Sequence, residues 1–342
     1  MKLTSGEIYF IKEHDVLTKI ETSYVKIGLV KEDKKEKRSS TERALEHQTG
    51  NPRKLSIFHV VKTPLLSTVE NKLHRYYAKN RISGEWFEMT AELLKAAMGQ
   101  AAIFAEIAKK DFEVLSAADA LDAQLSTESI LEPTEILEGL RASLLNSKLK
   151  LKTCEKLDDA YKELVATIAK TEPGSDHIAT KVTKAPKEVF NKEAFEKAYP
   201  ELWSEFQIVS ESFSHTFYLD GVRGHKVELE NIDHDLSVFK INFESELMLV
   251  KEKKHRIEIL QDLYFDLRIL QSAISEDCEV LEAKLKVECG TAREIRGICK
   301  WSRVMTEKTS FDKDGFDLKY PDLSAEFTTT IEVPEGYIAA KF

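Results

Sequence analysis

The chain has 342 residues, with 50 Lys and Arg against 59 Asp and Glu and a net charge of −9. It is long enough to bury a core and to form more than one domain, and its 42% hydrophobic content excludes a wholly disordered chain. The four cysteines form no C-x-x-C pair, so we expect no disulfide framework or zinc ribbon. No stretch reaches the ~18 apolar residues of a membrane span. We therefore expect a soluble, cytoplasmic protein.

Charge is distributed unevenly along the chain. Residues 1–99 contain 18 Lys and Arg and 13 Asp and Glu, a net +5, which leaves 32 and 46 for residues 100–342, a net −14. A basic first domain followed by an acidic remainder predicts that a polyanion binds at the N-terminal end only.

The first 98 residues read as a small α/β domain. Strand-like segments rich in β-branched and aromatic residues alternate with helical segments that follow capping residues. We expect strands at 7–12, 24–30 and 54–62, a helix from Thr41 to residue 48, a helix capped by Ser67 or Thr68 that runs to about residue 79, and a helix from Thr90. Three strands with flanking helices are of ordinary domain size, so we predict a small three-stranded antiparallel sheet.

The rest of the chain reads as mostly helical. Residues 102–170 and 236–290 show long helical periodicity without sustained heptads, which favours paired antiparallel helices. Residues 190–206 recur as 311–327, with eight of 17 positions identical. We therefore predict a duplicated helical region, divided into modules at 99–208 and 209–342 after an N-terminal domain at 1–98.

Several short motifs of the first 90 residues occur together. The segment Gly6-Glu7-Ile8-Tyr9 lies in the first strand, Lys26-Ile27-Gly28 ends the second, and Glu70 is followed by His74 and the return GEWF at 84–87. In this order, the segment of about residues 5–98 resembles the GIY-YIG nuclease superfamily. It is most similar to the phage-type branch whose second half-motif reads K-I-G.

This resemblance implies a metal-dependent DNA endonuclease. In this superfamily a helix glutamate binds the metal, so the resemblance implies that Glu70 is a ligand for Mg²⁺ or Mn²⁺. One carboxylate with waters and phosphate oxygens is a normal Mg²⁺ shell. Arg43 has the paired donors that suit a scissile phosphate. His47, one helical turn later, is expected to assist proton transfer or hold the nucleophile.

Tyr9 is the candidate general base. A free tyrosine has a pKa of ~10, too high for base action at neutral pH. We expect Lys26 on the adjacent strand to lower that pKa, because a nearby ammonium favours the phenolate. Tyr24 is the alternative second tyrosine, and Lys26 is preferred because Gly28 then follows Ile27 directly.

The surrounding residues have less specific expected roles. His74 is expected to pack under the GEWF turn, with metal binding as the alternative. Glu85 is expected to be structural, with metal contact as the alternative, and Trp86 and Phe87 are expected to close the core. Four basic side chains are candidates for nucleic-acid contact: Arg53, Lys54, Arg75 and Arg81.

The sequence thus predicts a DNA endonuclease whose helical C-terminal region gives targeting, oligomerisation or a protein-binding surface. By resemblance, its setting is phage or mobile-element biology. The alternative is a non-catalytic DNA- or partner-binding protein that retains the fold.

Overall fold

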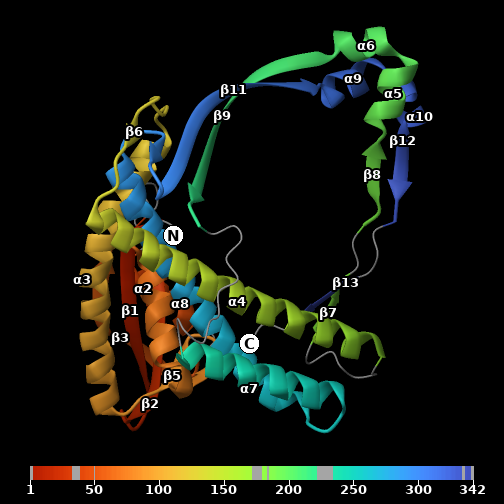
Figure 1. Cartoon of the computed structure of the whole chain (residues 1–342). Helices are drawn as coiled ribbons and strands as arrows, with labels where there is room; N and C mark the ends of the chain where they lie inside the picture. The colour runs from red at the N-terminus through yellow and green to blue at the C-terminus, as the bar shows by residue number, and fades with distance from the viewer. Residues whose placement is uncertain are drawn as a thin grey trace. The chain divides into compact units, whose positions relative to one another are not determined.

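The structure is a computed structural model that describes residues 3–32, 39–49, 51–171, 179–182, 185–221, 234–332 and 336–339 (Figure 1). The chain divides into two compact units, each built from segments far apart in the sequence. The first unit comprises 1–124, 131–148 and 271–291, and the second comprises 125–130, 149–270 and 292–342. The expected boundary at residue 98 falls inside helix α3 (Ala91–Asp122). The division into three consecutive domains stays a prediction.

The first unit contains an antiparallel sheet with the strand order β3-β1-β2-β5-β4. Its strands are β1 (Gly6–His14), β2 (Glu21–Lys31), β3 (Lys54–Thr63), β4 (Arg81–Ser83) and β5 (Trp86–Glu88). The three long strands were predicted, but the prediction of a three-stranded sheet was wrong. The two added strands have three residues each, too few to show an alternating pattern.

Alternation along β1 sends side chains to the two faces of this sheet. Ile8 and Phe10 are buried on one face, in a core with residues of α2 (Leu66–Tyr76) and α3. Tyr9 and Ile11 are buried on the other face, where they cluster with Ala44 of α1 (Ser40–Gln48). Tyr9 therefore lies on the α1 face of the sheet, and α2 packs on the other face.

Capping residues explain where the helices of the first unit begin. The Ser39 side chain accepts from the N–H of Glu42, whose side chain binds back to Ser39, so α1 starts with a capping box. Thr90 caps α3, as predicted. Helix α2 begins at Leu66, before the predicted caps, and ends at Tyr76; the 3-10 turn η1 (Ala78–Asn80) follows.

The second unit combines helices with a long β-ribbon. The helices are α4 (Glu135–Thr171) from residue 149, α7 (His234–Lys251) and α8 (Ile257–Cys289) up to residue 270. These helices confirm the mostly helical prediction. The ribbon pairs β9 (Gln207–Leu219) with β11 (Cys299–Phe311) along 13 residues, and neither strand was predicted. The short strands are β6 (Ile130–Leu131), β7 (Ala179–Val182), β8 (Lys187–Phe190), β10 (Glu294–Ile295), β12 (Thr328–Ile331) and β13 (Gly336–Ala339).

The two similar 17-residue segments have the same local structure. Each forms two short helices: α5 (Lys192–Ala198) and α6 (Pro200–Glu205) in one, α9 (Lys313–Lys319) and α10 (Pro321–Glu326) in the other. These four helices gather at one end of the ribbon (Figure 1). The N–H of Asn191 donates to the carbonyl of Phe327 at 2.8 Å, and the N–H of Asp312 donates to that of Phe206 at 2.8 Å. Each segment thus completes the other, around buried Phe195 and Phe316.

Candidate active site

Tyr9 and Gly28 lie directly opposite each other on β1 and β2. The Tyr9 ring crosses Gly28 so closely that a Cβ added at Gly28 would lie 2.5 Å from the Tyr9 hydroxyl oxygen. Only glycine leaves room for this ring position. The register therefore gives a physical reason for the glycine of the K-I-G motif, and it fits the alignment that puts Lys26 before Ile27-Gly28.

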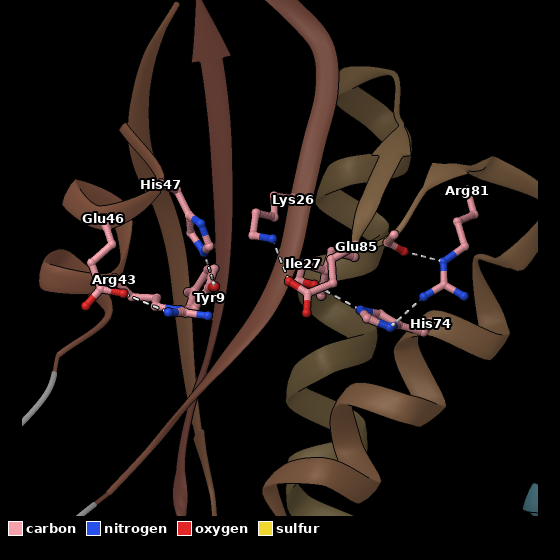
Figure 2. Close-up of polar contacts among 10 residues, drawn as sticks. Tyr9, Lys26, Ile27, Arg43, Glu46, His47, His74, Arg81 and Glu85 are labelled. Atoms are coloured by element: carbon pink, nitrogen blue, oxygen red, sulfur yellow. Dashed lines mark hydrogen bonds and ion pairs between the residues drawn. The ribbon is translucent and has the colours of Figure 1, made fainter. Parts of the chain in front are cut away.

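Two α1 side chains meet the Tyr9 hydroxyl. His47 Nε2 lies 3.2 Å from it (Figure 2), and the Arg43 guanidinium is near enough to lower the pKa of Tyr9 through hydrogen bonding and charge. Arg43 Nη1 also donates to Glu46 at 2.7 Å. Because Arg43 and His47 are four residues apart on α1, they share the helix face that points to β1. The structure thus brings together three of the five predicted catalytic residues.

Electrostatics at Tyr9 differ from the expectation. Burial and the charge of Glu85 raise the pKa of Tyr9 to about 12, against a lowering by Arg43. The Tyr9 side chain is only 1% exposed, which explains why burial dominates. The prediction that Lys26 lowers the pKa of Tyr9 was wrong. The pKa is raised, and the cation that acts against the rise is Arg43.

Lys26 forms an ion pair with Glu85. Its Nζ donates to Glu85 Oε2 at 2.6 Å (Figure 2), and the lysine is buried while the glutamate side chain is 43% exposed. Lys26 still acts on the site through its charge. Burial, then Lys26 and Arg43, lower the pKa of His47, which keeps this imidazole neutral at pH 7.

Glu70 is a partly buried carboxylate with an unsatisfied oxygen. Its Oε1 is buried and has no hydrogen-bond partner. Burial and the charge of Glu85 raise the pKa of Glu70 to about 7, against a lowering by Lys26 and Arg81, and the charge of Glu70 in turn raises that of Tyr9. Glu70 therefore lies within electrostatic range of Tyr9.

These residues fit a divalent cation held by one protein carboxylate. A cation beside Glu70 would satisfy the unpartnered oxygen and remove the cost of a buried charge. Across the described ranges, no three His, Cys, Asp or Glu side chains gather as a metal-binding set. Waters and phosphate oxygens would thus complete the shell.

His74 fixes α2 against the sheet. Its Nε2 lies 2.9 Å from the carbonyl oxygen of Ile27 and therefore donates to it (Figure 2). Its Nδ1 accepts from Arg81 Nη2 at 3.2 Å, and Arg81 Nε donates to the carbonyl of Gly84 at 2.6 Å. The ring packs 5.2 Å from that of Phe87, so the expected packing under the GEWF turn is confirmed. With both nitrogens engaged, His74 has no lone pair for a metal.

The four basic side chains predicted for nucleic-acid contact have different surroundings. Arg75 was a wrong prediction, because it forms a nearly buried ion pair with Glu276. Arg81 holds His74 and the GEWF turn, as described above. Arg53 lies 3.3 Å from Glu13 and is 44% exposed, and Lys54 is exposed at the start of β3. Only these last two are exposed enough to stay candidates.

The partners of two residues were not predicted. No local pattern indicates that Glu85 neutralises Lys26. The same holds for Glu276, which lies 201 positions after Arg75. Pairing over such a distance has no local pattern.

Residues 6–102 match the T5orf172 domain, which belongs to the GIY-YIG/homing-endonuclease-like superfamily of phage-type nucleases. The match covers the whole sheet, α1, α2 and the start of α3. No curated protein and no solved structure matches the chain. Within the described residues, no helix has the length and apolarity to cross a membrane.

Proposed function

We propose that this protein is a metal-dependent endonuclease that hydrolyses DNA phosphodiester bonds with its GIY-YIG-type N-terminal domain. The strongest support is that Arg43 and His47 both interact with Tyr9. The Glu70 carboxylate, which has an unpartnered oxygen, lies within electrostatic range of the same residue. The net charge of +5 over residues 1–99 suits a polyanionic substrate. Phage or mobile-element biology is its natural setting, since the matched domain belongs to phage-type nucleases.

Proton transfer is the part of the reaction that these side chains would perform. A phenol with a pKa of about 12 is protonated at neutral pH, whereas His47 is neutral and able to accept a proton. We infer that the attacking water gives a proton to the Tyr9 oxygen while Tyr9 gives its own to His47 Nε2. The water oxygen then bonds to phosphorus as the bond to the leaving oxygen breaks.

Arg43 would bind the substrate phosphate. It is partly exposed, it interacts electrostatically with Tyr9, and its planar donors suit two phosphate oxygens. Because Tyr9 itself is almost fully buried, Arg43 is the group that would bring a phosphate to it, and His47 is the group through which its proton would leave.

Glu70 would hold the Mg²⁺ or Mn²⁺ ion. When bound, such an ion neutralises charge on the phosphate and on the leaving oxygen. Glu85, held by Lys26, adds negative charge beside Glu70 and would favour cation uptake.

A plasmid-nicking assay tests the proposal. Supercoiled DNA is incubated with the wild-type chain in Mg²⁺, in Mn²⁺ and in EDTA, and with Glu70→Ala. We expect metal-dependent relaxation by the wild type and a loss of at least ~100-fold in Glu70→Ala. Glu88→Gln, at an exposed carboxylate of β5, is the matched control and should cut normally. Absence of wild-type cleavage in both metals would refute the proposal.

A non-catalytic role is the second candidate. Two observations favour it: burial keeps the Tyr9 phenol away from solvent, and its raised pKa makes it a poor proton donor. DNA binding that is equal in Mg²⁺ and EDTA, without cleavage, would support this candidate.

We propose that the C-terminal region gives targeting, oligomerisation or a protein-binding surface, and that its two similar segments are copies of one duplicated element. The same cap position and the exchanged hydrogen bonds of Asn191 and Asp312 support the duplication. A chain with Phe195→Ala, which opens the shared aromatic core, should keep non-specific nicking and lose the targeting or assembly. Specific cleavage and an oligomeric state identical to the wild type would contradict this role.

A further inference from the structure

We propose that Glu276, on helix α8, is a positioning residue for the metal-binding helix α2. This inference rests on the proposed function and extends it to a part of the chain outside the matched domain. Residues 271–291 belong to the same compact unit as the sheet, although the matched domain ends at residue 102.

The contact between the two helices is a nearly buried ion pair. Arg75 Nη1 donates to Glu276 Oε1 at 2.8 Å, and Arg75 Nη2 donates to Glu276 Oε2 at 2.7 Å. The two side chains are 13% and 10% exposed. Arg75 Nη1 also donates to Ser272 Oγ at 2.8 Å, and Lys72 Nζ lies 3.8 Å from Glu276. Two turns of α8 thus face one turn of α2.

Such a pair sets geometry better than it adds stability. A bidentate guanidinium–carboxylate contact fixes two atoms on each partner and so fixes orientation. Removing two charges from water costs much of what their attraction returns, so a buried pair is weak evidence for a stability gain. Its value here is that α2 has one position relative to α8.

The pair can fix the position of Glu70 although Arg75 does not point toward it. Residues of a helix are about 100° apart around its axis, so Arg75 points about 140° away from Glu70. His74, on the Glu70 side, binds the carbonyl of Ile27 in the K-I-G strand. Contacts to β2 on one side and α8 on the other stop α2 from rolling or sliding. The carboxylate of Glu70 is therefore held where the cation would bind.

Metal affinity in the full-length chain tests this inference. Mn²⁺ binding is followed by the loss of the free-ion EPR signal, with unfolding curves recorded beside it. We expect Glu276→Gln to weaken Mn²⁺ binding about tenfold, the lower end of the ~10–100-fold losses caused by changes around metal ligands. The exchange Arg75→Glu with Glu276→Arg should recover most of that affinity.

Glu282→Gln is the matched control. Glu282 also lies on α8, and its ion pairs are with Lys148 at 3.0 Å and Lys286 at 3.5 Å, both outside α2. It should leave Mn²⁺ affinity within about twofold of the wild type while losing an α8 ion pair of its own. If Glu276→Gln fails to fold, Ser272→Ala removes one acceptor of Arg75 without burying a charge and should give a smaller loss in the same direction.

The outcomes separate the two proposals. Equal Mn²⁺ affinity in Glu276→Gln and the wild type overturns the positioning role and leaves the endonuclease intact. An equal loss in Glu276→Gln and Glu282→Gln also overturns it, because any weakened α8 would then suffice. A wild type that binds no Mn²⁺ and nicks no DNA overturns the proposed function itself.

Discussion

Replacing Gly28 with alanine should damage the site without touching a polar group. The added methyl would lie 2.5 Å from the Tyr9 oxygen, 2.7 Å from Cζ and 3.0 Å from Cε2. Contacts this short require movement. The Tyr9 backbone cannot yield, because it pairs with Gly28 on one side and Val60 on the other. The ring must therefore move away from Gly28, which disturbs its contact with His47.

Two separate losses follow from that movement. Overpacking of this kind costs about 1–3 kcal/mol of unfolding free energy. Misplacing a catalytic group by ~1 Å costs about 100-fold in rate. Urea unfolding followed by circular dichroism measures the first, and the nicking rate in Mg²⁺ measures the second, at protein concentrations where Gly28→Ala stays folded.

Gly99→Ala is the control for both measurements. Gly99 lies in α3, and the methyl group that alanine adds there would have no atom within 4 Å. Alanine at this position should therefore raise stability by up to ~1 kcal/mol and leave nicking unchanged. If Gly28→Ala unfolds at the wild-type urea concentration and nicks at the wild-type rate, the reasoning about the K-I-G glycine fails.

Three further predictions concern charge and protons at the site. Tyr9→Phe removes the hydroxyl that meets His47 and should slow nicking by ~10²–10⁴-fold with the fold intact; a rate within threefold of wild type excludes Tyr9 from proton transfer. Lys26→Met removes a charge that lowers the pKa of His47, so the acidic limb of the kcat/KM profile should move to higher pH, and an unmoved limb argues against a neutral His47 as acceptor. In EDTA, the folded chain keeps a proton on Glu70 up to pH about 7, whereas the unfolded chain releases this proton near pH 4.5. The free energy of unfolding should therefore fall by about 3 kcal/mol as the pH rises across that interval. Glu70→Gln should remove this decline, which urea unfolding at several pH values will show.

The local part of the fold was predictable from sequence. Thr90 marks a helix start because a capping side chain satisfies N–H groups next to it in the chain, and the helix predicted from Thr41 begins one residue earlier, after its cap Ser39. Strands β1, β2 and β3 are long enough to show which residues alternate between faces. The short strand β5 forms on the edge of β2, and β4 forms on the edge of β5, so the information that specifies them is not local.

The electrostatic part of the site was predictable only in part. The spacing of Arg43 and His47 places both on one helix face, and the structure brings both to Tyr9. Strand alternation also places Lys26 on the same face as Tyr9. What alternation cannot reveal is that a carboxylate from the β4–β5 turn binds the ammonium, or that burial raises the pKa of a phenol more than any neighbour lowers it.

The exchanged pairing of the two similar segments has a consequence for shortened forms of the chain. Strand β9 depends on β11, and β8 depends on β12, so both strands that flank the first segment borrow their neighbours from the second. A premature stop before residue 299 would remove both partner strands, β11 and β12. Strands β9 and β8 would then have unpaired edges, which can pair with other chains. Loss of residues 299–342 should therefore appear as insolubility of the part that is kept.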